Sequence, residues 1–463
     1  MSAMNSHPIL DDIRAARPDL RLLTEPAETT DYRRDETDFI PFGQPQAVAF
    51  PTSTADVSAV VRACAQHKVP VVARGGGSGL SGGANAMDGW IVLAMSGMDR
   101  IIEIDPDNLV VVTQPGVITA NLEAAVEAQG LLYPPDPASH DLSFIGGNIA
   151  ENAGGLRCVK YGVTRDYVLG LEVVLADGEV IRVGGRNVKD VMGYDLTRLM
   201  VGSEGTLGII TEATLRLRPK PAPKTTLLAF FPSVAQAGHA VSRITAAGVT
   251  PVTLEMLDRN IIDAVEGALQ LGLDPAAGAM LMIESDAGGT LAEAELDTVE
   301  AACREAGSTS IDRATNPDEA DAMREARRQA HWSLKQLGQA RTEDVSVPRS
   351  RVGELIEAIA EISEQHDMRI GVFGHAGDGN FHPAYVTGHD DPRAEERTEA
   401  VRADVYTAVL KLGGTITGEH GTGLTKRDFL EQQFGPRGVA AMRAIKDALD
   451  PDGILNPGKL LPD

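Results

Sequence analysis

Residues 74–84 read RGGGSGLSGGA, and this glycine-rich stretch decides how the chain is interpreted. It follows VPVVARG (69–75), an apolar run typical of a buried strand. Gly77, Gly79 and Gly82 match G-x-G-x-x-G, a dinucleotide pattern in which a helix begins at the third glycine. The chain instead continues NAMDGWIVLAM, a turn and then a strand. We therefore reject a Rossmann nicotinamide site and predict a backbone nest for phosphate, with a plain flexible loop as the alternative.

The segments before and after this stretch alternate between strand and helix. AVAFPTS (47–53) reads as a strand, TADVSAVVRACAQHK (54–68) as an amphipathic helix, and 118–129 as a further helix. LGLEVVLADGEVIRVGG (169–185) predicts a hairpin that turns at Asp-Gly. Residues 1–36 look like a short helical lead-in. RLRPKPAPKTT (216–226), with three prolines, looks like a domain linker.

Beyond the linker the sequence predicts a second set of helices and strands. Two helical patterns lie between 290 and 365, and another lies at about 393–412. MRIGVFGHAGDGNFHPAYV (368–386) reads as two strands joined by a glycine-rich turn. GGTITGEHGTG (413–423) reads as a loop, and the C-terminus as a turn-rich return segment.

Composition limits the class of protein. The 463 residues are too many for one ordinary core, so we expect two or three domains in a soluble globular chain. The net charge of −24 argues against nucleic-acid binding. Three cysteines without a C-x-x-C pair favour the cytoplasm. No apolar run is long enough for a transmembrane segment.

Two further blocks make a family resemblance plain. They are PPDPASHDLSFIGGNIAENAGGLRCVKYGVTR (134–165) and KDVMGYDLTRLMVGSEGTLGIITE (189–212). With the glycine-rich loop, in this order, they resemble the FAD-binding domain of the vanillyl-alcohol oxidase/p-cresol methylhydroxylase (PCMH) superfamily. Within it the chain is similar to the glycolate oxidase FAD subunit, the flavin D-lactate dehydrogenases and D-2-hydroxyglutarate dehydrogenase.

This resemblance implies an α+β fold with a PCMH-type FAD-binding domain and an α/β cap, the C-terminal domain of FAD-linked oxidases. We expect the FAD domain at 1–220, with its core at about 45–220, and the substrate-covering cap at 221–415. A return segment at 416–463 would complete both the active site and the FAD site.

The resemblance also implies which residues hold FAD. The loop would cradle the pyrophosphate, the second block would line the flavin and its ribityl chain, and the third would lie near the adenine half and the flavin. The implied contacts are Arg74, Gly75, Gly76, Gly77, Ser78, Gly79, Leu80, Ser81, Gly82, Pro135, Asp136, Ser143, Gly146, Gly147, Asn148, Asn152, Gly154, Gly155, Glu204, Gly205, Gly208, Ile210 and Asn456. Many of these glycines could equally be turn residues. The loop has no histidine, so we predict non-covalent FAD.

The histidines indicate a metal site. His375 and His382 flank the turn in GHAGDGNFH, and Glu419 and His420 are adjacent in TGEHGTG. On two arms of a hairpin the histidines can point into one space, and a carboxylate from a second loop would complete three ligands with an open position. Such a set suits Zn²⁺ or Mn²⁺. Histidines that are hydrogen-bonded without a metal are the alternative.

In the D-2-hydroxyglutarate and D-lactate enzymes, the positions matching His375, His382 and Glu419 hold a divalent metal, and the position matching His420 is the general base. Oxidation of a 2-hydroxy acid removes the hydroxyl proton, which suits a histidine, and transfers the C2 hydrogen to flavin N5. A metal lowers the pKa of the hydroxyl and orients the acid. Asn380 would be a polar substrate contact.

An arginine suits the substrate carboxylate, because its fork binds both oxygens. MREARRQAHW (323–332) offers Arg324, Arg327 and Arg328. Relatives carry an arginine shortly before a D-x-x-x-P segment, here EDVSVP (343–348), and Arg327 aligns best. An arginine on a solvated helix face is the alternative.

The same stretch bears on the substrate. The 2-hydroxyglutarate enzymes carry a lysine just before the D-x-x-x-P segment, where this chain has Thr342 followed by Glu343. A second carboxylate would lack a partner there, so we favour D-lactate or glycolate. D-2-hydroxyglutarate is the alternative substrate.

Electrons must leave the reduced flavin, and the sequence shows no iron–sulfur or haem motif. The acceptor would be another protein, a quinone or oxygen, and partner subunits or a homodimer are open. A quinone acceptor would place the chain peripherally at the inner membrane. Two alternatives lie outside hydroxy-acid oxidation. One is a nicotinamide-using reductase or aldonolactone oxidase on the same FAD fold, and the other is a non-catalytic FAD-binding subunit.

Overall fold

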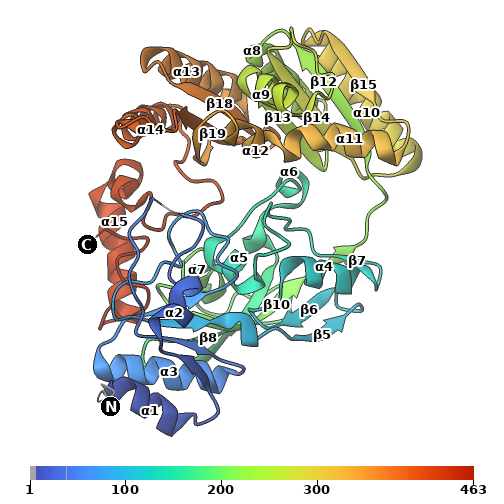
Figure 1. The fold of residues 1–463 in the computed structure, drawn as a ribbon. Helices are drawn as coiled ribbons and strands as arrows, with labels where there is room; N and C mark the ends of the chain where they lie inside the picture. The colour runs from blue at the N-terminus through green and yellow to red at the C-terminus, as the bar shows by residue number, and fades with distance from the viewer. Residues whose placement is uncertain (1–6, 38, 463) are drawn as a thin grey trace. The chain divides into compact units, whose positions relative to one another are not determined.

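The computed structural model describes residues 7–37 and 39–462 (Figure 1). The chain divides into two compact units. The first unit holds Met1–Gly154, Val163–Lys220 and Glu419–Asp463, and the second holds Gly155–Gly162 and Pro221–Gly418. Gly155–Gly162 is grouped with the second unit, although it lies within the range expected for the FAD domain, and the expected domain bounds stay a prediction.

A small sheet opens the first unit. Its strands β2 (Ala47–Phe50), β4 (Ile91–Ala94) and β3 (Val71–Arg74) run parallel, and β1 (Arg21–Leu23) pairs with β2 antiparallel. The predicted strands and the helix α3 (Thr54–His67) between them are confirmed. No helix lies between β3 and β4, which confirms that the Rossmann pattern fails.

The helical lead-in is only partly confirmed. Helices α1 (Pro8–Ala16) and α2 (Pro26–Thr29) are present, but the strand β1 lies between them. The prediction was wrong for Arg21–Leu23, because pairing with β2 supplies these residues with a ladder that local sequence cannot reveal.

A second, antiparallel sheet of the first unit has the order β5-β6-β10-β8-β9. Its bounds are β5 (Ile101–Asp105), β6 (Val110–Thr113), β10 (Ile209–Arg216), β8 (Val168–Val174) and β9 (Val180–Gly184). The predicted hairpin is therefore confirmed as β8 and β9. Helix α3 packs its Val57, Val60 and Val61 into one core with both sheets and with Ile454 and Leu455 of the C-terminal segment.

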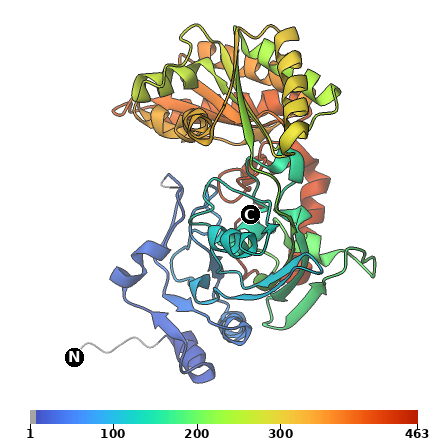
Figure 2. The same cartoon turned by 90° about the vertical axis from the view of Figure 1, so that its right-hand side faces the viewer.

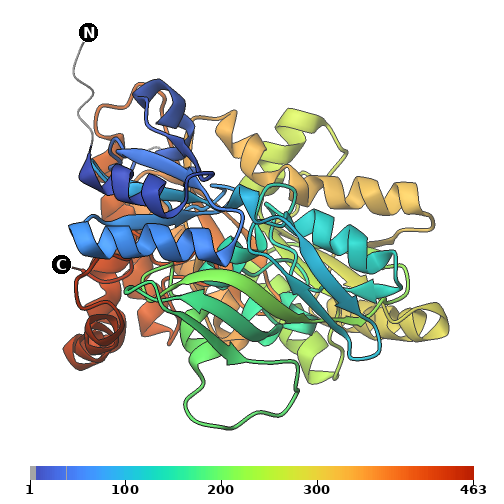
Figure 3. The same cartoon turned by 90° about the horizontal axis from the view of Figure 1, so that it is seen from below.

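The remaining elements of the first unit connect these layers. They are α4 (Thr119–Glu127), β7 (Leu131–Leu132), α5 (Ile145–Glu151), α7 (Leu196–Met200), β11 (Arg218–Pro219) and α15 (Leu430–Leu449). The expected linker therefore contains a short strand, β11, which pairs with β7. Between β9 and α7 a loop extends from the sheet (Figure 3), and its Val191, Met192 and Tyr194 are exposed.

The second unit is built on one large sheet with helices on both faces (Figure 2). The strand order is β15-β12-β14-β13-β18-β19-β16, and β17 also pairs with β19. The bounds are β12 (Thr225–Phe231), β13 (Thr253–Asp258), β14 (Ala279–Ser285), β15 (Ser310–Arg313), β16 (Gln339–Thr342), β17 (Val345–Ser346), β18 (Arg369–His375) and β19 (Asn380–Thr387). The predicted hairpin at 368–386 is confirmed by β18 and β19.

Apolar residues of α9 (Arg259–Leu269), α11 (Pro317–Arg328) and α12 (Ala330–Lys335) share a core with the strands. Helices α10 (Gly289–Glu305), α8 (Val234–Ala246), α13 (Val352–Gln365) and α14 (Ala394–Lys411) pack in a row. Four helices, α10 to α13, lie between about 290 and 365, where only two helical patterns were predicted. A short helix, α6 (Cys158–Tyr161), belongs to the inserted segment. The α+β prediction is confirmed. In the described part of the chain, no helix is long and apolar enough to cross a membrane.

Candidate functional site

The first unit contains a cavity of about 230 Å³ beside the glycine-rich loop that follows β3. Most of its lining comes from three segments that lie far apart in the sequence: the loop, helix α5 with the residues on either side of it, and Ser203–Gly205 with Gly208–Ile210. Many of the lining residues are glycines, whose backbone N–H groups no side chain covers. This is the arrangement expected for binding a phosphate-containing ligand through N–H groups.

Close approach explains two of the glycines. Gly77 has φ +77°, and a β-carbon there would meet the Arg74 guanidinium at 2.2 Å. A β-carbon on Gly76 would meet the carbonyl oxygen of Leu142 at 2.1 Å. A side chain at either position would displace the loop or the segment that faces it.

Most of the predicted FAD contacts line this cavity. They are Gly75, Gly76, Gly77, Ser78, Gly79, Leu80, Ser143, Gly146, Gly147, Asn148, Gly154, Glu204, Gly205, Gly208 and Ile210. The structure thus brings together segments that lie more than one hundred residues apart in sequence. It supports the expected cradle as a geometric feature of one unit.

The other predicted contacts are not among the lining residues. They are Arg74, Ser81, Gly82, Pro135, Asp136, Asn152, Gly155 and Asn456. Arg74 turns away, and its guanidinium donates to the carbonyls of Arg34 (2.6 Å) and Asp31 (3.1 Å). Asn456 donates to the carbonyls of Gly83 and Glu204. Arg74 and Asn456 therefore support the loops rather than face the cavity.

Sequence reasoning missed several lining residues, among them Pro115, Phe144, Glu151 and Asp35. Asp35 comes from the N-terminal segment, where no motif marks it. Burial and the nearby Glu204 carboxylate raise the pKa of Glu151 well above its usual value. Nearby, the buried Lys459 ammonium donates to the carbonyl of Asn85 (2.7 Å), and burial lowers its pKa to about 8.

In the second unit, His375 ends β18 and His382 lies in β19, so the hairpin places both on one face of the sheet. Both side chains are buried, and their Nε2 atoms are 3.5 Å apart. Two nitrogens bound at Zn–N distances to one tetrahedral ion would be about 3.4 Å apart. The histidine pair therefore fits a shared divalent metal.

Glu255, on β13, fixes the orientation of His375. Its Oε1 lies 2.7 Å from His375 Nδ1, which directs the Nε2 of the ring toward His382. A carboxylate on the distal nitrogen of a ligating histidine is the usual second contact in metal sites. Although burial would raise the pKa of Glu255, the nearby His375 and Arg327 lower it to about 2.

Contact with the Glu255 carboxylate distinguishes Arg327 from the other two candidate arginines. Arg327 Nε donates to Glu255 Oε2 (2.6 Å), and the guanidinium lies 5.0 Å from the centre of the Phe373 ring. Among the described residues its two terminal nitrogens have no hydrogen-bond partner. Arg324, by contrast, uses its terminal nitrogens on Glu284, Thr226 and Asp321.

Arg328 is half-exposed and pairs with Glu325. Of the three candidates, only Arg327 is thus anchored beside the histidine pair with a terminal fork available for a carboxylate.

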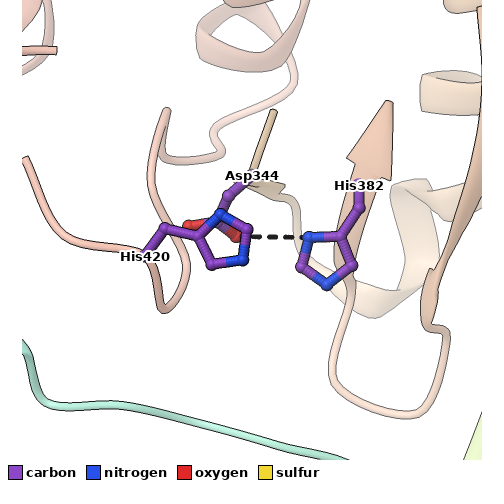
Figure 4. Close-up of side chains that lie close together, drawn as sticks. All are labelled: Asp344, His382 and His420. Carbon is purple, nitrogen blue, oxygen red and sulfur yellow. Dashed lines mark ion pairs between the residues drawn. The ribbon is translucent and has the colours of Figure 1, made fainter. Parts of the chain in front are cut away.

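Asp344 is a buried carboxylate close to His382. It is fully buried, and its Oδ1 accepts a hydrogen bond from Asn380 Nδ2 (2.6 Å) and lies 4.0 Å from His382 Nδ1 (Figure 4). Asn380 Nδ2 also donates to the carbonyl of Val345. Both amide protons of Asn380 are therefore used within the protein.

Glu419 and His420 belong to the first unit, where both line the cavity. A β-carbon on Gly154 would meet Glu419 Oε2 at 2.3 Å. The Glu419 side chain therefore fits beside the cavity only because residue 154 is a glycine. In the chain, both residues directly follow Gly418, the last residue of the second unit.

Thr342 ends β16, and Glu343 follows it. Thr342 Oγ1 is 2.9 Å from His331 Nδ1, and Glu343 Oε2 accepts a hydrogen bond from the buried Tyr406 hydroxyl (2.5 Å). Glu343 is thus part of a buried polar network.

Two family models match the chain, a FAD binding domain over residues 45–184 and the C-terminal domain of FAD linked oxidases over residues 220–460. The chain is 48% identical over 417 residues to glycolate oxidase subunit GlcD of Bacillus subtilis (strain 168), covering 90% of this chain and 89% of the relative. It is 36% identical to a D-lactate dehydrogenase of Anaerostipes hadrus, covering 95% and 94%.

Among solved structures, substrate-bound p-cresol methylhydroxylase superposes with a TM-score of 0.79, covering 98% of this chain and 96% of that one. At 18% identity this likeness concerns the fold alone.

Proposed function

Because the chain belongs to the family of FAD-linked oxidases, we propose that this FAD-dependent oxidoreductase oxidises a small D-2-hydroxy acid to the 2-oxo acid. One observation carries the proposal. A single buried carboxylate, Glu255, orients both a candidate metal ligand, His375, and a candidate carboxylate-binding group, Arg327. A 2-hydroxy acid has the two functions that such a pair would bind, an acid group and a neighbouring hydroxyl.

His420 is the proposed base. It lines the cavity of the segments that are proposed to bind FAD, and from there it would take the hydroxyl proton of a substrate. Bound FAD, which we propose is non-covalent, supplies the two-electron acceptor for the C2 hydrogen.

His375, His382 and Glu419 are the proposed ligands of a divalent metal, Zn²⁺ or Mn²⁺. The spacing of the two Nε2 atoms and the carboxylate behind His375 support this assignment. Glu419, which follows Gly418 in the chain, would add an oxygen ligand. Such an ion lowers the pKa of a bound hydroxyl and holds the acid in one orientation.

Arg327 is the proposed partner of the substrate carboxylate. Its Nε is held by Glu255 and its plane by Phe373, so the fork is ordered before substrate binds. Asn380 remains a proposed substrate contact through its Oδ1 alone.

The substrate is proposed to be glycolate or D-lactate. Thr342 is held by His331, and no lysine stands there to pair with a second carboxylate. The names of the relatives, glycolate oxidase subunit and D-lactate dehydrogenase, agree with a monocarboxylate. D-2-hydroxyglutarate is the alternative.

The electron acceptor is proposed to be a protein or a quinone. The Bacillus subtilis relative is named as a subunit, which favours partner subunits over a homodimer. The cytoplasmic location stays a prediction.

Anaerobic bleaching of the bound flavin at about 450 nm tests the proposal directly. The panel is D-lactate, L-lactate, glycolate and D-2-hydroxyglutarate, each with and without a chelator. We expect bleaching by glycolate or D-lactate that is lost on chelation. If dithionite bleaches the flavin and none of the four acids does, hydroxy-acid oxidation is wrong for this protein.

Replacing Arg327 with lysine keeps the charge beside Glu255 but removes the fork. Because charge-assisted bonds are worth roughly 1.5–3 kcal/mol, we expect kcat/KM to fall about 10- to 100-fold, mainly through KM. Steady-state assays with the acid that bleaches the flavin measure kcat and KM. The matched control is Arg324→Lys, since Arg324 lies one turn away on α11 and pairs with another buried glutamate, Glu284. Equal losses in both variants would show that Arg327 is only structural.

A further inference from the structure

The segment TGEHGTG (417–423) carries both the proposed base and a proposed metal ligand, and a buried carboxylate holds each of its ends. At the first end, Asp344 Oδ2 accepts hydrogen bonds from the backbone N–H of Gly418 (2.7 Å) and from Thr417 Oγ1 (3.0 Å). Asp344 is 0% exposed, so these bonds are shielded from water.

At the other end, Glu204 performs the same task within the first unit. Its Oε1 accepts the N–H of Thr422 and its Oε2 the N–H of Gly423, both at 2.7 Å. Glu204 itself has a left-handed backbone, φ +52°, and its carbonyl accepts a hydrogen bond from Asn456 (2.8 Å). The backbone of Glu204 is therefore itself anchored by Asn456.

Only Glu419, His420 and Gly421 lie between the two fixed ends. The segment contains Gly418, Gly421 and Gly423, and glycine loses more conformational freedom on ordering than any other residue. Without restraint, such a stretch would sample many backbone conformations.

We infer that Asp344 and Glu204 are positioning residues, which clamp the two ends of this loop and thereby set the direction of Glu419 and His420. The catalytic part of this inference rests on the proposed function, and the clamp itself does not.

The packing around Gly418 supports a clamp rather than a general contribution to stability. A β-carbon on Gly418 would meet Asn380 Nδ2 at 2.2 Å and Asp344 Oδ1 at 3.0 Å. A side chain at 418 would therefore collide with the Asn380 amide and crowd the Asp344 carboxylate. The other oxygen of Asp344 contacts Asn380, beside His382, so one side chain links the histidine face of the second unit to the start of the loop.

Hydrogen exchange on the full-length, FAD-bound protein tests the clamp without reference to any activity. In Asp344→Asn we expect the amide of Gly418 to exchange at least about tenfold faster, because its charge-assisted bond is lost, while the amides at 422–423 stay as they were. Glu204→Gln should give the reverse pattern.

Matched controls are Asp258→Asn in the second unit and Asp450→Asn in the first. Each is a buried carboxylate that accepts two backbone N–H groups elsewhere, at Ile261 and Val372 or at Ile454 and Leu455. Neither control should change exchange within 417–423. Unchanged exchange in both test variants, or equal acceleration in the controls, would overturn the clamp.

Zinc affinity and turnover, measured per bound FAD, then separate the two proposals. We expect Asp344→Asn to weaken both by about 10- to 100-fold, the usual cost of losing an outer contact of a metal site. Faster exchange with unchanged zinc affinity and turnover would keep the clamp and overturn its positioning role. If the unsubstituted protein binds no zinc and oxidises no hydroxy acid, the proposed function fails, while the exchange result stands by itself.

Discussion

Replacing His420 with glutamine is expected to slow reduction of the flavin by substrate by about 10²- to 10⁴-fold, the usual contribution of a positioned base. Glutamine keeps a polar side chain of similar length but cannot take the hydroxyl proton. His420 lines the cavity but lies outside 74–84, 134–165 and 189–212, the segments expected to hold most of the FAD, so FAD binding should be unchanged. Anaerobic stopped-flow absorbance with glycolate or D-lactate measures the rate.

His67→Gln is the matched control, because His67 lies on α3 of the same unit and pairs with Asp12. Its flavin should be reduced at the rate of the unsubstituted protein. A His420→Gln rate within threefold of the control, with FAD still bound, would remove His420 from the chemistry.

Replacing His382 with alanine is expected to abolish stoichiometric binding of zinc or manganese. A three-ligand site that loses one nitrogen cannot fill the coordination of the ion, and turnover should fall on the order of 100-fold or more. Elemental analysis of the dialysed protein and calorimetric titration with the metal alone measure the loss. A chelator should inactivate the unsubstituted protein and leave the residual activity of the variant unchanged.

His366→Gln controls for this substitution, since His366 is a partly exposed histidine of the second unit that pairs with Asp404. It should keep its metal and its activity. An active His382→Ala variant that a chelator still inactivates would mean that the metal is held elsewhere.

The site was predictable wherever a motif is local. The hairpin that carries His375 and His382 follows from two apolar runs around a glycine-rich turn. The two histidines share a face because His382 lies two residues beyond Asn380, the residue opposite His375. The glycines of 75–79 likewise identify a backbone cradle. Glu255 could not be found, because it lies on a strand that reads as an ordinary buried run and matters only through its pairing with His375 and Arg327.

The sequence by itself determined the class of this protein: an FAD-binding chain with a cap, a histidine pair on a hairpin, and a glutamate and histidine in a glycine-rich loop. The FAD-binding class and the cap follow from the resemblance of three ordered blocks to a known family. The histidine pair and the Glu419–His420 pair follow from residue type and spacing, because each is encoded within a few neighbouring positions.

Only the tertiary structure decided that Arg327, rather than Arg324 or Arg328, keeps its terminal nitrogens available, and that Arg74 turns away from the cavity. It also decided that Asp344 and Glu204 hold the loop. A hydrogen bond or an ion pair depends on which groups folding brings within about 3 Å, and that is set by packing between segments far apart in the chain.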